Sequence, residues 1–214
     1  MKLKHTRAGR AGGFTLIEMV AVIFIIGILT TFLVVTLGKT GEVAKEKITA
    51  SYLQQLSAAI AEYENQHGDF PPSAWKEEWN TAPNSTNVGA EALVLTLFSG
   101  KFQANLPDDR LVNTDNDMSQ KPLARFPKAD LFELKDEWGN PIAYLHRRDY
   151  KRQDVYLLLD PATGEPRESS LLAAMNPKTG EPFNPRGFQL VSAGVDGEFG
   201  TADDIGNWAK PEEE

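Results

Sequence analysis

The sequence contains no cysteine, so it offers neither a disulfide framework nor a thiol nucleophile. This absence fits a reducing compartment, and it fits an exported domain that folds without disulfides equally well. Histidine is scarce: none of the three, His5, His67 and His146, has partners at the spacing of a metal site or catalytic triad. Each is interpreted as a solvated side chain. We therefore expect no enzymatic activity, with an anchored hydrolase as the alternative.

Basic residues are outnumbered by acidic ones, 22 Lys and Arg against 30 Asp and Glu, which gives a formal net charge of −8. An acidic chain lacks the clustered cations that nucleic-acid binding needs, so we expect no nucleic-acid partner. The first 13 residues are an exception, because they carry Lys2, Lys4, Arg7 and Arg10. Lys and Arg stay on the cytoplasmic side of a membrane, so this leader predicts that the rest of the chain is exported.

Charge is missing from Met19 to Leu37, an apolar run about as long as a bilayer-spanning helix needs. Glu18 stands just inside the apolar block, where a lone carboxylate is costly in lipid. An ordinary signal peptide is disfavoured because no A-x-A site follows the run. A plain single-pass anchor and cleavage between Gly13 and Phe14 both remain open. Cleavage would free an amine at Phe14, with which Glu18 of a neighbouring copy could pair.

The junction and the apolar run occur together in the stretch Arg-Ala-Gly-Gly-Phe-Thr-Leu-Ile-Glu-Met-Val, residues 10–20. This stretch resembles the class III signal of type IV pilins and type II secretion pseudopilins. The resemblance implies that a prepilin peptidase cuts after Gly13 and methylates Phe14. It also implies that Glu18 serves the assembly of a helical homopolymer.

The chain is expected to divide into five parts. The helix should leave the membrane and become amphipathic, because apolar residues recur at steps of three and four. It should end near Gly68, ahead of two prolines. The predicted stripe is Ile48, Tyr52, Leu56, Ala59, Ile60 and Tyr63. The parts are a cleaved leader (1–13), a transmembrane and assembly helix (14–38), an amphipathic helix (39–68), a globular domain (69–209) and an acidic tail (210–214).

The globular part is predicted to be α+β. Residues 89–98 indicate a short buried helix, and residues 70–87 and 105–127 are typical of loops. Strands are predicted at residues 142–145, 154–159 and 188–192, where β-branched and aromatic residues gather. Sequential strands favour a small antiparallel sheet packed on the apolar stripe of the long N-terminal helix.

Acidic residues crowd a glycine-rich stretch, Val-Asp-Gly-Glu-Phe-Gly-Thr-Ala-Asp-Asp-Ile-Gly-Asn-Trp, residues 195–208. Hard oxygen ligands on such a loop suit Ca²⁺, although an acidic surface turn explains the composition as well. The spacing is not that of an EF-hand. A second stretch begins like an EF-hand at Asp115, but it has Gln120 where glycine belongs and Phe126 at its end.

The pattern Asp-Glu-Trp-Gly-Asn-Pro at residues 136–141, followed by the acidic loop, is similar to the C-terminal part of the major pseudopilin of type II secretion. There the loop binds one calcium ion. The resemblance implies ligation by Asp196, Thr201, Asp203 and Asp204, with main-chain oxygens of Ala193 and Glu198. Long insertions at 98–131 and 148–185 depart from the family pattern.

The expected function is that of a structural pseudopilin, a subunit of a periplasmic filament that drives type II secretion. The resemblance implies a single-pass protein of the bacterial inner membrane, with its C-terminal domain in the periplasm. The implied partners are copies of itself, prepilin peptidase, the assembly platform with its secretion ATPase, minor pseudopilins and membrane lipid. A type IV pilin for adhesion, motility or DNA uptake, or an anchored periplasmic binding module that never polymerises, are the alternatives.

Overall fold

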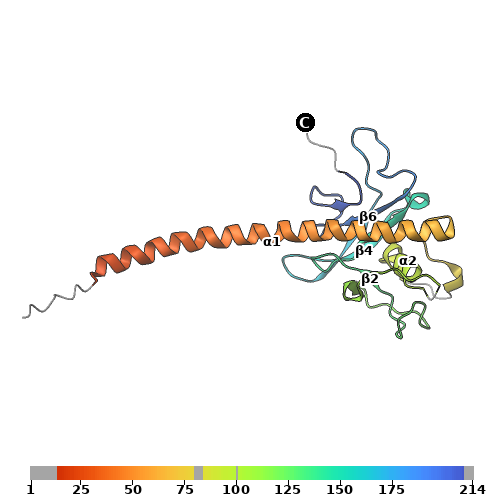
Figure 1. Cartoon of the computed structure of the whole chain (residues 1–214), viewed down its shortest axis with the longest axis horizontal. Coiled ribbons are helices and arrows are strands. Elements are labelled where there is room, and N and C mark those ends of the chain that lie inside the picture. The colour runs from red at the N-terminus through yellow and green to blue at the C-terminus, as the bar shows by residue number, and fades with distance from the viewer. Residues whose placement is uncertain (1–13, 80–83, 100, 210–214) are drawn as a thin grey trace, which may run out of the picture. The chain divides into compact units, whose positions relative to one another are not determined.

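The computed structural model describes residues 14–79, 84–99 and 101–209, without the side chains of residues 32–39. The predicted leader with Gly13 and the predicted acidic tail lie outside these residues. The chain contains helices α1 (Leu16–His67) and α2 (Val88–Leu97), with single 3₁₀ turns at Glu77–Trp79, Asp108–Arg110 and Arg147–Asp149. The strands are β1 (Leu111–Val112), β2 (Glu133–Leu134), β3 (Ala143–His146), β4 (Asp154–Leu159), β5 (Pro166–Leu171), β6 (Phe188–Ser192) and β7 (Ile205–Gly206) (Figure 1).

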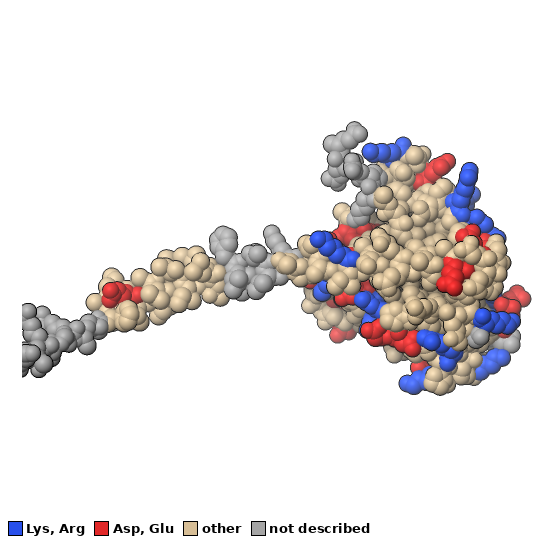
Figure 2. Space-filling view, in the orientation of Figure 1, with Lys and Arg blue, Asp and Glu red and all other residues tan. Residues whose placement is uncertain are grey.

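The chain divides into two compact units, residues 1–43 and 44–214. In the first, the described side chains from Phe14 to Thr31 are exposed and, except for Glu18, carry no charge. Figure 2 shows this surface as uncharged apart from one acidic patch. Within the described residues, no helix is both long and apolar enough to cross a membrane. The predicted span at 14–38 includes side chains outside that description.

The second part of α1 presents the predicted apolar stripe to the core, with one correction. Tyr52, Leu56 and Ile60 are buried, but Ile48 is 45% exposed. Its neighbour Thr49 faces inward instead and accepts a hydrogen bond from the backbone N–H of Glu137 through its hydroxyl. The helix ends at His67 as predicted, because Gly68 adopts a left-handed conformation with φ +79°.

The strands form three small antiparallel sheets instead of the single predicted sheet. The first pairs β1 with β2, the second has the order β3-β6-β7, and the third pairs β4 with β5. The predicted strands are confirmed, but β3 and β4 do not pair. Strand β4 pairs with β5, a strand that the sequence did not predict, with Asp154 opposite Leu171. The fold is α+β, as expected.

Two apolar clusters hold the second unit together, one on each face of the β3-β6 pair. Tyr144 and Leu190 belong to the cluster that packs against α1 and α2. Ala143, Leu145 and Val191 belong to the cluster that also contains side chains of β4 and β5. This alternation follows from the two-residue period of a strand. The β3-β6 pair is therefore covered on both sides.

Candidate functional site

The start of α1 is capped by three reciprocal hydrogen bonds between Thr15 and Glu18. The Thr15 backbone N–H and its hydroxyl each donate to Glu18 Oε2 at 2.8 Å, and the Glu18 N–H donates to Thr15 Oγ1 at 3.3 Å. This arrangement is a capping box, which satisfies backbone donors at a helix start. The spacing Thr-x-x-Glu is the sequence signal of this cap, which is a second role for Glu18 beside the assembly role expected from its place in the apolar run. Phe14, the predicted new N-terminus, is 80% exposed.

The predicted calcium loop is organised around Asp203. Its Oδ2 accepts hydrogen bonds from the N–H groups of Val195 at 2.7 Å and Asp196 at 3.0 Å. Its Oδ1 accepts a hydrogen bond from the Thr201 hydroxyl at 2.6 Å. Partial burial raises the pKa of Asp203, but these hydrogen bonds outweigh it and hold the pKa below its ordinary value. Asp203 is therefore ionised at neutral pH.

The other predicted ligands surround this centre. Asp204 accepts a hydrogen bond from the N–H of Gly200 at 2.7 Å, and the main-chain oxygen of Glu198 accepts one from Thr201 at 3.3 Å. The Ala193 residue is buried at the end of β6. This donor set of carboxylates, hydroxyl and main-chain oxygens has the chemistry that Ca²⁺ prefers. In the arrangement seen, the acidic side chains of the loop do not form a group of three within 4.8 Å. The calcium assignment stays a prediction.

A different acidic cluster does bring its carboxylates together. Its members are Glu91 of α2, Asp115 of the loop after β1, and Glu133 of β2. One carboxylate oxygen of each lies within 4.8 Å of the other two, and among the described residues no other such group of three occurs. An EF-hand pattern that begins at Asp115 fails at Gln120 and Phe126, so the sequence alone gives no signal for this cluster. Glu91 and Glu133 are too far from Asp115 in the sequence to belong to such a pattern.

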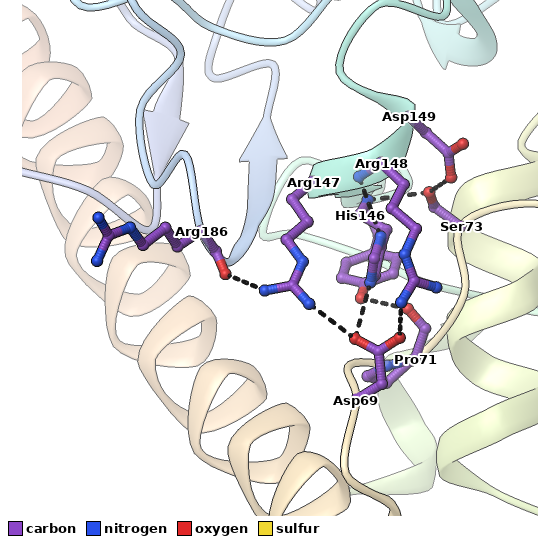
Figure 3. Close-up of polar contacts among 9 residues, drawn as sticks. Asp69, Pro71, Ser73, His146, Arg147, Arg148, Asp149 and Arg186 are labelled. Carbon is purple, nitrogen blue, oxygen red and sulfur yellow. Dashed lines mark hydrogen bonds and ion pairs between the residues drawn. The ribbon is translucent and has the colours of Figure 1, made fainter.

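A polar cluster at the end of α1 contains His146, and the prediction that this histidine is solvated is wrong. Its exposed fraction is 3%, because it lies on β3 behind the segment that follows α1. Figure 3 shows the Asp69 carboxylate facing His146, Arg147 and Arg148. The His146 Nδ1 accepts from the Arg148 N–H at 3.1 Å, so its Nε2 carries the hydrogen that faces Asp69 Oδ1 at 3.4 Å.

Ser73 lies beside His146, but the two do not form a catalytic pair. The Ser73 hydroxyl donates to Asp149 Oδ2 at 2.6 Å and accepts from the backbone N–H of His146 at 2.9 Å. The Tyr144 hydroxyl donates to the Pro71 main-chain oxygen at 2.6 Å. These bonds attach the segment after α1 to β3 (Figure 3). The other described histidine, His67, is exposed and stacks on Tyr63 with ring centroids 4.1 Å apart.

The capped N-terminal helix and the α+β unit of small sheets are consistent with a pilin-like protein. Residues 9–34 match the family described as "Prokaryotic N-terminal methylation motif". This match confirms the predicted class of N-terminal signal.

Three relatives specify the resemblance further, and all carry the name type II secretion system core protein G. The chain is 27% identical to the Pseudomonas aeruginosa protein over 199 residues, which cover 92% of this chain and 94% of the relative. It is 25% identical to the Aeromonas hydrophila protein, with 93% of both chains covered. It is 27% identical to the Escherichia coli K12 protein, with 92% and 90% covered. No solved structure matches the chain. The predicted resemblance to the major pseudopilin is confirmed.

Proposed function

We propose that this chain is a non-catalytic pseudopilin subunit that polymerises into a periplasmic pseudopilus and drives type II protein secretion. The observation that carries the proposal is the combination of an N-terminal methylation motif with similarity to core protein G along more than nine tenths of the chain. A shared N-terminal motif alone would fit any pilin-like protein. The similarity continues through the globular unit, which favours the secretion pseudopilin over a type IV pilin.

The proposal assigns partners and a location. Prepilin peptidase removes residues 1–13, and residues 14–38 hold the subunit in the inner membrane before assembly. The acidic globular unit lies in the periplasm. The assembly platform with its secretion ATPase adds subunits, minor pseudopilins form the other filament components, and copies of the chain contact one another through their N-terminal helices.

Processing provides the first test. Mass spectrometry of the protein purified from membranes should find Phe14 at the N-terminus, methylated, when prepilin peptidase is co-expressed. Without the peptidase the same chain should begin at Met1, which serves as the control. A mature chain that starts beyond Leu37 would contradict the proposal. Overexpression should also produce filaments that can be sheared from the cells and seen by electron microscopy. Their absence would favour an anchored binding module that never polymerises.

We also propose that the loop at residues 193–204 binds one Ca²⁺ through Asp196, Thr201, Asp203 and Asp204, with main-chain oxygens of Ala193 and Glu198. Support comes from the oxygen-rich donor set and from the ionised state of Asp203. Calcium modules outside the cell bind with Kd on the order of 10⁻⁴–10⁻³ M. Millimolar Ca²⁺ should then add about 1 kcal/mol to the free energy of unfolding.

Thermal melts of the full chain in detergent test this assignment. Calcium should raise the Tm of the wild type relative to EGTA, and magnesium should raise it much less. The Asp203→Ala variant should lose the part of the calcium response that this loop contributes and should therefore respond less than the wild type. Equal responses of the wild type and Asp203→Ala would mean that this loop is an acidic surface turn.

A further inference from the structure

Four acidic side chains from three separate segments meet beside the N-terminal half of α2. Glu91 belongs to the first turn of α2, Asp115 and Asp117 to the loop after β1, and Glu133 to β2. Asp117 belongs to this group because its charge acts on the Glu91 carboxyl. The loop after β1 is part of the insertion at 98–131. The cluster is separate from the loop at residues 193–204.

Glu91 is buried without an N–H or hydroxyl donor. Its exposed fraction is 0%, and the carboxyl of Asp117 is close enough for a hydrogen bond only if one of the two groups carries a proton. Four further oxygen atoms in the loop after β1 are also buried without a donor that meets hydrogen-bond geometry: Asp115 Oδ1, both carboxylate oxygens of Asp117, and the Asn113 amide oxygen. Buried polar atoms are almost always paired, so this many unpaired oxygens in one place indicate a missing positive partner.

The surrounding amides hold the carboxylates in position. Asn84 Nδ2 donates to Asp115 Oδ2 at 2.9 Å, which leaves Asp115 Oδ1 directed elsewhere. Asn87 Nδ2 donates to Glu133 Oε1 at 2.9 Å, and the Thr114 N–H donates to Glu133 Oε2 at 3.1 Å. Carboxylate oxygens can still accept further partners after one hydrogen bond each. Such supporting bonds around acidic ligands are typical of metal sites.

No cation of the protein neutralises this group: among the described residues, no Lys or Arg forms an ion pair with any of the four acidic side chains. Burial raises the pKa of Glu91 to about 10, and the charge of Asp117 adds to the shift. Burial likewise raises the pKa of Glu133 to about 8, helped by Asp115. The carboxyls must therefore take up either protons or a cation. A proton lets Glu91 donate a hydrogen bond to the Asp117 carboxyl but still leaves other buried acceptor oxygens of the cluster unpaired.

We propose that Glu91, Asp115 and Glu133, with Asp117 beside them, bind one Ca²⁺ ion that fastens the loop after β1 to α2 and β2. The spacing is compatible with one ion, because two oxygens that each lie about 2.4 Å from a Ca²⁺ ion are at most about 4.8 Å apart, and the three carboxylate oxygens lie within that limit. Carboxylate oxygens are the hard ligands that Ca²⁺ prefers in flexible sites, whereas Mg²⁺ usually keeps several waters. Asp115 and Asp117 are partly exposed as whole residues, so the cluster lies close to the surface of the loop after β1.

Counting bound calcium tests this site directly. The full chain in detergent is stripped with EGTA, and Ca²⁺ binding is then followed by calorimetry and by elemental analysis after gel filtration. The variants are Glu91→Gln and Asp115→Asn, with Asp109→Asn as the matched control. Asp109 lies in the same insertion, is exposed and stands outside the cluster. Each protein is also prepared in the Asp203→Ala background, which removes any contribution of the loop at residues 193–204.

We expect one calcium equivalent that depends on Glu91 in both backgrounds. Glu91→Gln and Asp115→Asn should weaken it at least tenfold, Asp109→Asn should change it less than twofold, and Mg²⁺ should replace it poorly. Calcium should also slow amide hydrogen exchange in residues 113–119 of the wild type but not of Asp115→Asn. This second measurement keeps the test valid if Glu91→Gln folds badly.

Two results would overturn the proposal. One is an unchanged calcium count in both variants, and the other is no Ca²⁺ bound outside the loop at residues 193–204. Either result would mean that the cluster holds protons in place of an ion. Binding to the purified chain does not require a filament, so failure here is distinguishable from failure of the proposed pseudopilin function.

Discussion

His146 is the buried titratable residue whose surroundings are best defined. Its pKa is lowered, mainly because burial disfavours the charged ring and also because Arg148 repels it. The carboxylates of Asp69 and Asp149 act in the opposite direction but do not offset burial. The unfolded chain therefore protonates His146 more readily than the folded chain does, since an ordinary histidine has a pKa of about 6.5.

This difference predicts a pH dependence. The contribution of neutral His146 to the free energy of unfolding should be fully present above a pH of about 6.5. It should fall as the pH drops below this value, because the unfolded state then binds the proton more readily than the folded state. His146→Asn should remove this part of the decline, since Asn can accept the Arg148 N–H but does not titrate. Chemical denaturation of both proteins at pH 7.5 and 5.5 measures the difference. Equal losses of stability in the two proteins would mean that His146 does not titrate in this range.

Single residues show what the sequence could predict. Glu18 was recognised from its position in an apolar run, and its capping partner could have been found from the spacing alone. The stretch at Asp115 fails the EF-hand pattern at Gln120 and Phe126, and the residues that it does meet, Glu91 and Glu133, come from distant segments. Tertiary packing brings such distant carboxylates together. The periodicity of apolar residues and the spacing of a local motif describe only neighbours in the sequence, so they do not predict this cluster.

At the scale of elements, α2 lies unusually close to β3. A Cβ atom on Gly89 would clash with the Tyr144 main-chain oxygen and the Tyr156 hydroxyl. These groups belong to the covered β3-β6 pair and to β4, so neither can move into solvent. The close packing of α2 on β3 places the first turn of α2, which includes Glu91, in the interior of the fold.

Gly89→Ala should therefore destabilise the chain by about 1–3 kcal/mol, the usual cost of overpacking. Gly41→Ala is the matched control, because Gly41 lies in α1 with no atom near the position of a new Cβ. It should instead add up to about 1 kcal/mol through better helix propensity. Urea denaturation in detergent, followed by tryptophan fluorescence, compares the three proteins. Stabilisation by both substitutions would contradict the close approach at Gly89.

The elements differ in how well the sequence predicted them. Strands β4 and β6 were predicted with their observed bounds, since apolar and aromatic residues mark them. Strand β5 was missed because its sequence, Pro-Arg-Glu-Ser-Ser-Leu, has little β propensity and four of its residues are not buried. It is a strand because β4 pairs with it. Pairing between strands could not be predicted either, so one sheet was expected where three occur.

For the whole molecule, the role of Glu18 in assembly needs separation from its role in capping α1. Glu18→Val removes both the charge and the capping box, whereas Glu18→Gln keeps a capping side chain and removes the charge. If assembly requires the charge, both variants should insert in the membrane but fail to form filaments. The yield of sheared filaments, measured beside the amount of processed subunit, decides between the two roles. Wild-type yield from Glu18→Gln would show that capping alone is sufficient.

The segment that follows α1 has a mechanical consequence. Asp69, Pro71 and Ser73 are bound to side chains or main chain of Tyr144, His146 and Arg148, and Arg152 also donates to the Ser73 main-chain oxygen at 2.7 Å. In a filament that advances by pushing on its helices, load enters each globular unit along α1. A force along α1 pulls parallel to the surface on which the helix packs. It therefore acts as shear, and it acts at the same time on these hydrogen bonds and on the buried stripe of α1. Contacts loaded in parallel share the force, so the helix is not peeled away from the sheet one bond at a time.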